Sequence, residues 1–236
     1  MTHFQLQGRA QKNKVGTTLS KSLVTLLDPA GVASEAYRSL RTGLLYAAVD
    51  APPTVILITS PGSEDGKSTT CANLAVVLAQ ADKQTLVIDG DLREPSLHKF
   101  FDVPNVSGVV DVLSGEHELL EVCKEPFAGL RVISAGPIPP NPAELLSSGR
   151  FSEFIGQARR LFDYVLIDSP PMGLVSDPVI IATRADGVLL VLDSGGTSKG
   201  SLRKAVRDLE AVEANVLGTV MNKAPKADIG HYGYGY

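Results

Sequence analysis

The sequence predicts an α/β fold in which a doubly wound, mostly parallel sheet carries helices on both faces. Six apolar runs rich in Val, Ile and Leu recur along the 236 residues, at 54–59, 85–89, 130–134, 164–168, 187–192 and 216–221. The runs are continuous rather than alternating, which indicates strands that are buried on both faces. Amphipathic stretches separate most of them, and this alternation of strand and helix is typical of the doubly wound class.

The predicted helices lie between or before these runs. We expect them at 33–48, 68–80, 150–161 and 202–214. In the first helix, Tyr37, Leu40 and Leu44 share one face at helical spacing, which is typical of an amphipathic helix. A further helix is expected to begin at Asn141, since Asn is a favoured N-cap and proline suits the first turn.

The chain divides into three parts. Residues 1–32 are interpreted as a flexible N-terminal segment, 33–226 as one folded domain and 227–236 as a tyrosine-rich tail. A chain of this length is sufficient for one domain with a single large core. The glycines of the tail argue against regular structure there.

Composition excludes several classes of protein. Hydrophobic content of 44% and charged content of 20% are ordinary for a soluble globular domain. A net charge of −4 provides no electrostatic case for binding nucleic acid. No apolar run approaches the roughly 18–20 residues of a membrane span, and the N-terminus has no signal-peptide core. Cys71 and Cys123 have no metal-ligand spacing, so a reduced, cytosolic chain is the simplest interpretation.

A glycine-containing loop joins the apolar run at 54–59 to an amphipathic helix. Such a loop presents converging N–H donors to phosphate, supported by the positive end of the helix dipole. Lys67 would neutralise the β- and γ-phosphates and the Ser68 hydroxyl would bind Mg²⁺. The match to G-x-x-x-x-G-K-[ST] is imperfect because Pro61 takes the first glycine position, and Gly-Lys-Ser also occurs in surface turns. The expected nucleotide contacts are Gly62, Ser63, Glu64, Asp65, Gly66, Lys67, Ser68 and Thr69.

Aspartates end two further apolar runs. Asp89 and Asp91 flank a glycine after one run, and Asp168 ends another. Strand-end carboxylates meet at the carboxyl edge of a parallel sheet, beside the phosphate loop, where Mg²⁺ needs oxygen ligands. We expect Ser68, Asp91 and Asp168 to hold Mg²⁺ and Asp89 to act as the catalytic base, with Arg93 positioning one of the acids. A solvated acidic loop is the alternative interpretation. The three segments together predict hydrolysis or transfer of ATP phosphate, with Lys67 and the three aspartates as catalytic residues.

The three segments resemble those of one family. The phosphate loop, the run Leu86 to Arg93 (Leu-Val-Ile-Asp-Gly-Asp-Leu-Arg) and the run Val165 to Pro171 (Val-Leu-Ile-Asp-Ser-Pro-Pro) are similar to the motifs of the bacterial tyrosine kinases (BY-kinases) that control capsule and exopolysaccharide export. The family's second motif has the form apolar-apolar-apolar-Asp-x-Asp-x-Arg, which this chain matches at every position. The resemblance runs from about residue 34 to the end of the chain and implies a P-loop NTPase fold.

Further elements extend this resemblance. Glu35, Arg38 and Arg41 match the family's Glu-x-x-Arg-x-x-Arg element, implicated there in ring assembly, although the spacing alone favours a solvated, salt-bridged helix face. The segment Pro140-Asn-Pro-Ala-Glu-Leu-Leu146 is similar to another recurrent family segment. Tyr232, Tyr234 and Tyr236 stand where the family carries its autophosphorylated tyrosines. The resemblance also implies that Asn222 lies near adenine.

By this resemblance, the protein is expected to be an ATP- and Mg²⁺-dependent protein-tyrosine kinase that acts on the tail of its own kind, in trans between neighbours of a homo-oligomeric ring. The implied partners are a transmembrane polysaccharide co-polymerase or its short activator segment, further copies of the chain, and a cognate tyrosine phosphatase. The implied location is cytoplasmic, at the inner face of the plasma membrane through such a partner. We expect a separate chain rather than an excised cytosolic domain.

Two other functions are compatible with parts of the sequence. Partition- or septum-positioning ATPases share the fold, but they carry a signature lysine five residues before Lys67, where this chain has Gly62. A hydrolase of that group would also have no use for a tyrosine tail. A non-catalytic regulator, in which ATP only switches the assembly state, could keep every motif. Incubation with labelled ATP and Mg²⁺ separates it from a kinase, because only a kinase acquires base-stable phosphate.

Overall fold

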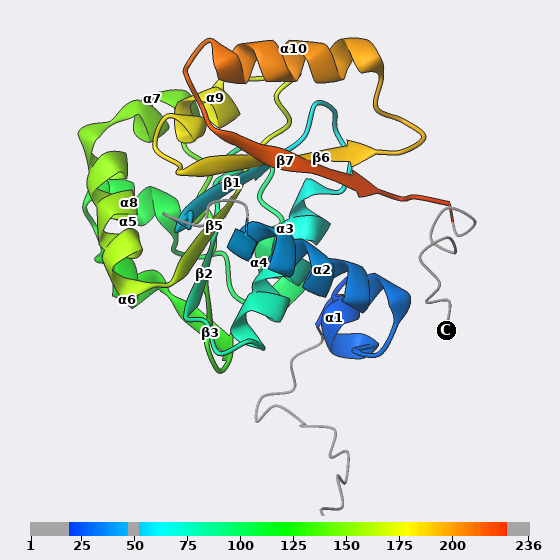
Figure 1. The fold of residues 1–236 in the computed structure, drawn as a ribbon. Helices are drawn as coiled ribbons and strands as arrows, with labels where there is room; N and C mark the ends of the chain where they lie inside the picture. The colour runs from blue at the N-terminus through cyan, green and yellow to red at the C-terminus, as the bar shows by residue number, and fades with distance from the viewer. Residues whose placement is uncertain (1–18, 47–51, 226–236) are drawn as a thin grey trace, which may run out of the picture.

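A seven-stranded sheet forms the centre of the computed structural model, which describes residues 19–46 and 52–225 (Figure 1). The strand order is β3-β4-β2-β5-β1-β6-β7, and every neighbouring pair is parallel except β3 and β4. The strands are β1 (Val55–Thr59), β2 (Thr85–Asp89), β3 (Lys124–Phe127), β4 (Leu130–Ile133), β5 (Tyr164–Asp168), β6 (Gly187–Asp193) and β7 (Val216–Asn222). The predicted fold class is confirmed.

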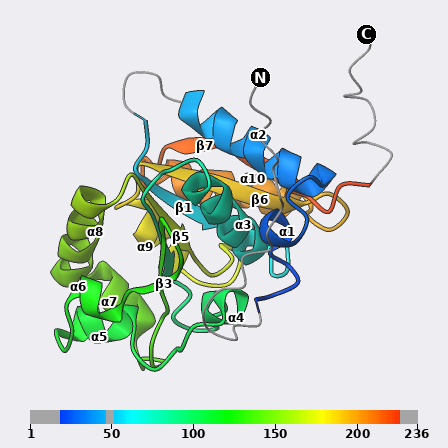
Figure 2. The same ribbon diagram turned by 90° about the horizontal axis from the view of Figure 1, so that it is seen from below.

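Helices cover both faces of this sheet, and two hydrophobic clusters fill the space beneath them. One cluster joins the sheet to α1 (Val24–Leu27), α2 (Val32–Tyr46), α3 (Lys67–Ala79) and α4 (Leu97–Phe101). Both views show α1 and α2 beside α3 (Figures 1 and 2). The other cluster joins it to α5 (Val109–Ser114), α6 (Leu119–Val122), α7 (Pro142–Ser147), α8 (Gly149–Leu161), α9 (Asp177–Ala182) and α10 (Lys199–Glu210).

The central strands are continuous apolar runs because both of their faces are buried. Every residue of β1, β2 and β5 is buried, including the aspartates that end β2 and β5. β3 was not predicted, because its four residues include Lys124, Glu125 and Pro126. It is an antiparallel edge strand, where proline and charge are tolerated.

The N-terminal boundary expected at residue 33 was placed too late. Leu23 and Thr25 are fully buried, and both the amide and the hydroxyl of Thr25 donate to Asn73 Oδ1, at 3.1 and 2.9 Å. The Ser20 amide donates to the Phe100 carbonyl at 3.1 Å. Residues 19–32 therefore belong to the domain, held by distant partners that local sequence does not reveal. The rest of the expected flexible segment (1–18) and the tail (227–236) lie outside the described residues.

The five predicted helices correspond to α2, α3, α7, α8 and α10. The expected end of the first helix, at residues 47 and 48, lies outside the described part of the chain. Within residues 19–46 and 52–225, none of the helices has the length and apolar character needed to cross a bilayer.

Candidate active site

The loop after β1 turns sharply into α3. Its last residue, Gly66, has a φ of +97°, a left-handed conformation that glycine adopts without steric cost. A Cβ at this position would also collide with the side-chain amide of Asn222. That amide donates from Nδ2 to the Asp65 carbonyl at 2.9 Å, so the end of β7 is attached to the loop. Asn222 thus lies beside the phosphate loop.

The loop holds its shape through contacts of its own. The Gly62 amide donates to Asp65 Oδ2 at 2.9 Å, and the Ser60 hydroxyl donates to the Gly62 carbonyl at 2.6 Å. The Asp65 side chain is buried, so these polar groups of Gly62 and Asp65 bind each other rather than facing outward. The chain after β5 supports the loop from outside: the amides of Met172 and Gly173 donate to the carbonyls of Ser60 and Pro61. The sequence did not predict this support.

Lys67, the first residue of α3, reaches toward the end of β2. Its Nζ lies 3.2 Å from Ser68 Oγ and 3.8 Å from Asp91 Oδ2. The Lys67 side chain is only 16% exposed and Asp91 is buried, so this ammonium and carboxylate interact where solvent screening is weak. The structure therefore brings together three residues that the sequence assigned to one site.

Asp89 and Asp168 sit opposite each other in the register of β2 and β5. The strands continue close together beyond them, because Gly90 donates its amide to the Asp168 carbonyl at 2.8 Å and leaves no room there for a Cβ. Burial, followed by the charge of Asp168, raises the pKa of Asp89 to about 8. Burial also raises the pKa of Asp168 to about 6, while the nearby Lys67 ammonium lowers it. The site thus concentrates negative charge that a cation would neutralise.

Several carboxylate oxygens in this group have no partner. Asp89 Oδ2 accepts the amides of Ser96 and Leu97, both at 2.9 Å, which ties it to the start of α4. Asp89 Oδ1 and both oxygens of Asp168 are buried without any hydrogen-bond partner among the described residues. Such atoms are costly unless a ligand binds them.

This donor set fits Mg²⁺ bound together with a nucleotide. Mg²⁺ is usually held by one or two carboxylates, waters and substrate phosphates rather than by a cage of protein ligands. In the described part of the chain, no cluster of three or more His, Cys, Asp or Glu side chains is arranged to hold a metal ion. Ser68, Asp91 and Asp168 are the residues that would hold the ion, and this assignment stays a prediction.

The side chain of Arg93 does not reach either strand-end aspartate of β2. Its guanidinium binds Asp177 with two hydrogen bonds, from Nε at 2.8 Å and from Nη2 at 3.0 Å. Asp91 Oδ1 instead accepts the backbone amides of Arg93 (3.3 Å) and Glu94 (2.9 Å). The guanidinium thus anchors the loop that carries Asp91 to Asp177, and the role of Arg93 in positioning one of the acids stays a prediction. Asp177 was missed, although its place at the start of a helix before Pro178 is a recognisable signal.

The three α2 residues lie apart from this site. Arg38 Nε donates to Glu35 at 2.8 Å and Nη2 donates to the Pro29 carbonyl at 2.8 Å, both within one subunit. Arg41 donates to the Val77 carbonyl of α3, also at 2.8 Å. The predicted interface residues are thus paired internally. Tyr232, Tyr234 and Tyr236 lie outside the described residues.

Comparison with known proteins assigns the chain to a family. Residues 56–231 match the CobQ/CobB/MinD/ParA nucleotide binding domain. The chain is 39% identical over 227 residues to the tyrosine-protein kinase YwqD of Bacillus subtilis, which covers 95% of this chain and 94% of that protein. It belongs to the bacterial tyrosine kinases. The predicted resemblance is confirmed, and the protein is a protein-tyrosine kinase.

Solved structures of bacterial tyrosine kinases agree in fold. The kinase domain of Escherichia coli tyrosine kinase ETK superposes with a TM-score of 0.83 at 33% identity, over 97% of this chain and 89% of that one. The septum site-determining protein MinD of Pyrococcus horikoshii shares the fold, with a TM-score of 0.63 at 23% identity over 75% of each chain. Some kinase relatives are longer: the chain spans 30% of the putative tyrosine-protein kinase EpsB of Ralstonia solanacearum, which is 36% identical over all of this chain.

Proposed function

We propose that this kinase transfers the γ-phosphoryl group of ATP to the tail tyrosines Tyr232, Tyr234 and Tyr236 of a second copy. One observation carries the proposal: at the mouth of the phosphate loop, Lys67 and Asp91 lie in the same group as the unpartnered oxygens of Asp89 and Asp168. A cation and a phosphate chain would satisfy these atoms together. The terminal tyrosines provide an acceptor on the same polypeptide.

In this proposal each residue has a distinct task. The loop amides and Lys67 bind the phosphates, while Ser68, Asp91 and Asp168 hold Mg²⁺, which when bound neutralises charge on the transferred group. Asn222 uses its Nδ2 on the loop, so its Oδ1 remains to accept the exocyclic amino group of adenine. Guanine carries a carbonyl oxygen at that place, so this acceptor would favour ATP over GTP.

The acceptor proton is assigned to Asp89. The phenol oxygen forms a bond to the γ-phosphorus, the bond from that phosphorus to the departing ADP oxygen breaks, and the phenolic proton passes to the carboxylate. Because Oδ2 of Asp89 is occupied by the amides of Ser96 and Leu97, Oδ1 is the oxygen that takes the proton. A phenol has a pKa near 10 and needs a base at neutral pH, and a cation bound beside Asp89 would lower the raised pKa of this carboxyl and keep it ionised to accept the proton.

The proposed biological role is to regulate the polymerisation and export of a capsular or extracellular polysaccharide. The names CapB and EpsB of similar kinases support this class of role. A transmembrane co-polymerase would recruit the kinase to the cytoplasmic face of the membrane and activate it. Assembly into a ring would bring each tail to a neighbour's site, and a cognate tyrosine phosphatase would reverse the modification.

Deleting residues 230–236 tests the acceptor assignment. The truncated protein should lose most phosphotyrosine after incubation with labelled ATP and Mg²⁺, while its affinity for a fluorescent ATP analogue stays unchanged. Strong labelling of the truncated protein would instead assign the phosphate to Tyr37, Tyr46 or Tyr164. Of these, Tyr164 is buried in β5 and Tyr46 is exposed at the end of α2, so peptide mapping would separate them.

Mixing two variants tests transfer between copies. A full-length Lys67→Met protein cannot hold the phosphates but keeps its tail, so only another copy can label it. Labelling of this protein by the active, truncated kinase supports transfer in trans. Labelling of the full-length active protein at a rate per molecule that does not depend on concentration, with none on the Lys67→Met protein, would show that each subunit uses its own tail.

A further inference from the structure

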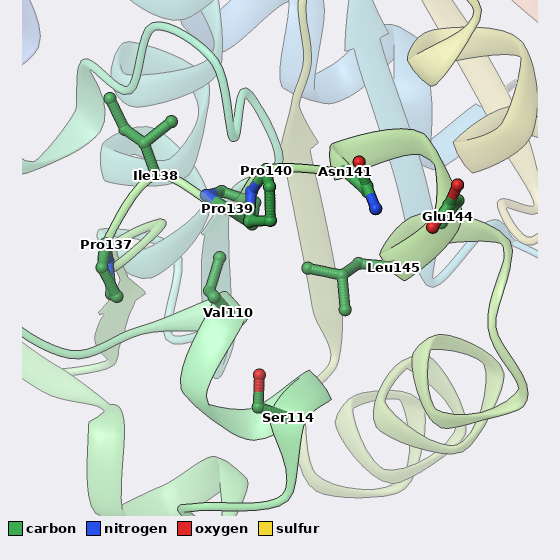
Figure 3. Close-up of a pocket in the computed structure, with 9 residues that line it drawn as sticks. All are labelled: Val110, Ser114, Pro137, Ile138, Pro139, Pro140, Asn141, Glu144 and Leu145. Atoms are coloured by element: carbon green, nitrogen blue, oxygen red, sulfur yellow. The ribbon is translucent and has the colours of Figure 1, made fainter.

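A hollow of about 480 Å³ lies between α5, α7 and the proline-rich segment that precedes α7 (Figure 3). Val110, Pro139 and Leu145 supply apolar surface, and Val110 and Leu145 point into the space between α5 and α7. Polar groups stand around this surface, on Ser114, Asn141 and Glu144. The mechanism proposed above uses none of these residues.

Backbone contacts place the hollow at the same edge of the sheet as the phosphate loop. The amides of Val109 and Val110, at the start of α5, donate to the carbonyls of Ser134 and Ala135 just beyond β4, both at 2.9 Å. β4 pairs with β2, the strand that ends in Asp89. On its far side α7 packs against α9, whose Asp177 holds Arg93. The hollow and the nucleotide site are thus neighbours along one edge.

Hydrogen bonds and prolines restrain the backbone on one side of the hollow. Asn105 holds Gly136 from both sides, accepting its amide at 2.9 Å and donating to its carbonyl at 3.2 Å. Prolines at 137, 139 and 140 restrict the backbone that follows. A site whose backbone is already restrained loses little conformational entropy when a ligand binds, and this favours binding of a rigid ring.

The chemistry of the hollow fits a phenol. An apolar floor accepts the ring face, and the hydroxyl, amide and carboxylate at the rim can bind the phenolic O–H. We propose that the hollow holds one tyrosine of a second copy's tail while another tyrosine of that tail lies at the nucleotide site. This inference rests on the proposed function, since it assumes that the tail is the substrate.

The spacing of the tail tyrosines suits two sites on one edge. In an extended chain, residues two apart face the same side, so Tyr232, Tyr234 and Tyr236 can present their rings in one row at steps of about 6.6 Å. One ring can then enter the nucleotide site while the next, or the one after it, enters the hollow. The alternating glycines leave the intervening backbone free of side chains that would obstruct this approach.

A second copy is the better source of this tail than the same subunit. The tail continues from β7, which lies five strand spacings from β4, or about 24 Å. From residue 225, Tyr232 reaches about 23 Å when fully extended and Tyr236 about 36 Å, so within one subunit Tyr232 falls just short of the hollow and only the later tyrosines could span the edge. A tail from a neighbour is free of that limit.

Single-tyrosine tails measure the contribution of the ring in the hollow. The acceptor is full-length Lys67→Met protein that keeps a single tail tyrosine. For each of the three positions, two acceptors are made: one has Phe and the other has Ala at the two remaining tyrosine positions. The kinase is the full-length protein with all three tail tyrosines replaced by Ala. Because Phe keeps the ring, at least one Phe tail should be labelled about fivefold faster than its Ala counterpart. Equal rates in all three pairs would overturn the inference.

Filling the hollow with a large side chain then tests whether the faster labelling of Phe tails arises from binding there. Ser114 is the exposed last residue of α5 and points into the hollow, so Ser114→Trp in the kinase should reduce the Phe-to-Ala ratio to about one. Ser147→Trp is the matched control: Ser147 is the exposed last residue of α7 but does not line the hollow, and the ratio should persist. Because the readout is a ratio, a general loss of activity in either variant does not affect it.

The outcomes separate this inference from the function on which it rests. A ratio that survives Ser114→Trp, or one that Ser147→Trp removes equally, would show that the ring binds elsewhere. If the unmodified tail acquires no phosphate from any copy, the proposed function fails and the inference with it. If the tail is labelled but Phe and Ala tails react equally, only the inference fails.

Discussion

The phosphate-loop region and the outer face of α2 both concentrate charged side chains, but they differ in how those charges are satisfied. Around the loop, Asp89 and Asp168 are fully buried and keep oxygens without a partner among the described residues. On α2, Glu35 and Arg38 bind each other while their side chains stay 66% and 29% exposed.

This difference shows which charges indicate a ligand. A buried polar atom without a partner costs about 1–3 kcal/mol, and a fold retains it where a ligand repays the cost. An exposed ion pair is worth about 0–1 kcal/mol and is common on any surface. The geometry of the loop region therefore indicates a binding site, whereas the geometry of the α2 face does not.

The largest effect is expected at Lys67. Lys67→Met removes the cation nearest Asp91 and should reduce tail phosphorylation about 10³-fold, because positioning and electrostatics supply most of phosphoryl-transfer catalysis. Phosphate incorporation from labelled ATP measures it, with circular dichroism to check the fold. The control is Lys204→Met, which removes an exposed lysine of α10 paired with Asp208. Equal incorporation by the Lys67 variant at matched ATP would refute the site.

A pH-dependent stability change is expected from Asp89. Its pKa is about 8 in the folded protein against an ordinary value of 3.8, so between those values the folded state binds more protons than the unfolded state. The stability of the nucleotide-free protein therefore falls as pH rises from about 4 to about 8. Asp89→Asn keeps an oxygen acceptor for the amides of Ser96 and Leu97 but cannot ionise.

Thermal unfolding between pH 5 and pH 8.5 tests this. The advantage of Asp89→Asn over the unmodified protein should grow with pH, to several degrees in Tm near pH 8. Asp208→Asn, at an exposed position of α10, should leave the pH profile unchanged. Identical pH profiles for Asp89→Asn and the unmodified protein would mean that Asp89 does not carry a raised pKa. The same variant should fail to phosphorylate the tail at any pH if Asp89 is the base.

A smaller effect is expected from the pair of Arg93 and Asp177. Either Arg93→Ala or Asp177→Ala releases the loop that presents Asp91, and should lower kcat about tenfold through misplacement of the carboxylate. ATP affinity should change little, since neither side chain contacts the phosphate loop. The kcat of the double variant should be no lower than that of the Asp177 variant, because each single substitution already removes the same interaction. Additive losses would indicate separate roles.

The smallest effect on the isolated subunit is expected on α2. Replacing Glu35, Arg38 and Arg41 with Ala removes one exposed pair, the Arg38 bond to the Pro29 carbonyl and one bond to α3, so the monomer should lose only about 1–2 kcal/mol of stability. If the same residues also contact a neighbour, light scattering should show a lower oligomer mass together with weaker tail phosphorylation. The control replaces the exposed α10 pair of Lys204 and Asp208. Unchanged mass would remove these residues from the interface.

The strands of the sheet and the reactive residues at their carboxyl ends could be predicted from local sequence. Six strands were predicted from their apolar runs, and five of them are largely buried on both faces. The burial predicted for the run at 216–221 is wrong, because β7 lies at the edge of the sheet and its residues are half-buried or exposed. Asp89 and Asp168 end two of the predicted strands, and parallel strands place their carboxyl ends at one edge, so the shared location of these residues follows from the fold class. Their position opposite each other depends on β2 and β5 being neighbours, which the sequence did not predict. Lys67 was recognisable because its motif stands between a strand and a helix.

Contacts between distant segments could not be predicted in this way. β3 lacks an apolar run, and Thr25 is buried because Asn73, far along the chain, accepts its hydrogen bonds. Arg93 binds Asp177 rather than a nearby acid, and Asp65 folds back on Gly62. Each depends on which side chain tertiary packing brings within reach, and local pattern carries no information about that choice.

The sequence by itself therefore determined the fold class, the edge of the sheet where chemistry occurs and the residue types gathered there. Periodicity and strand-end motifs are local properties, and the geometry of a parallel sheet converts them into a shared site. The tertiary structure alone decided which of those groups pair with one another, which oxygens stay unsatisfied, and where a hollow remains beside them. Hydrogen bonds act over about 3 Å, so such choices arise only once the chain has folded.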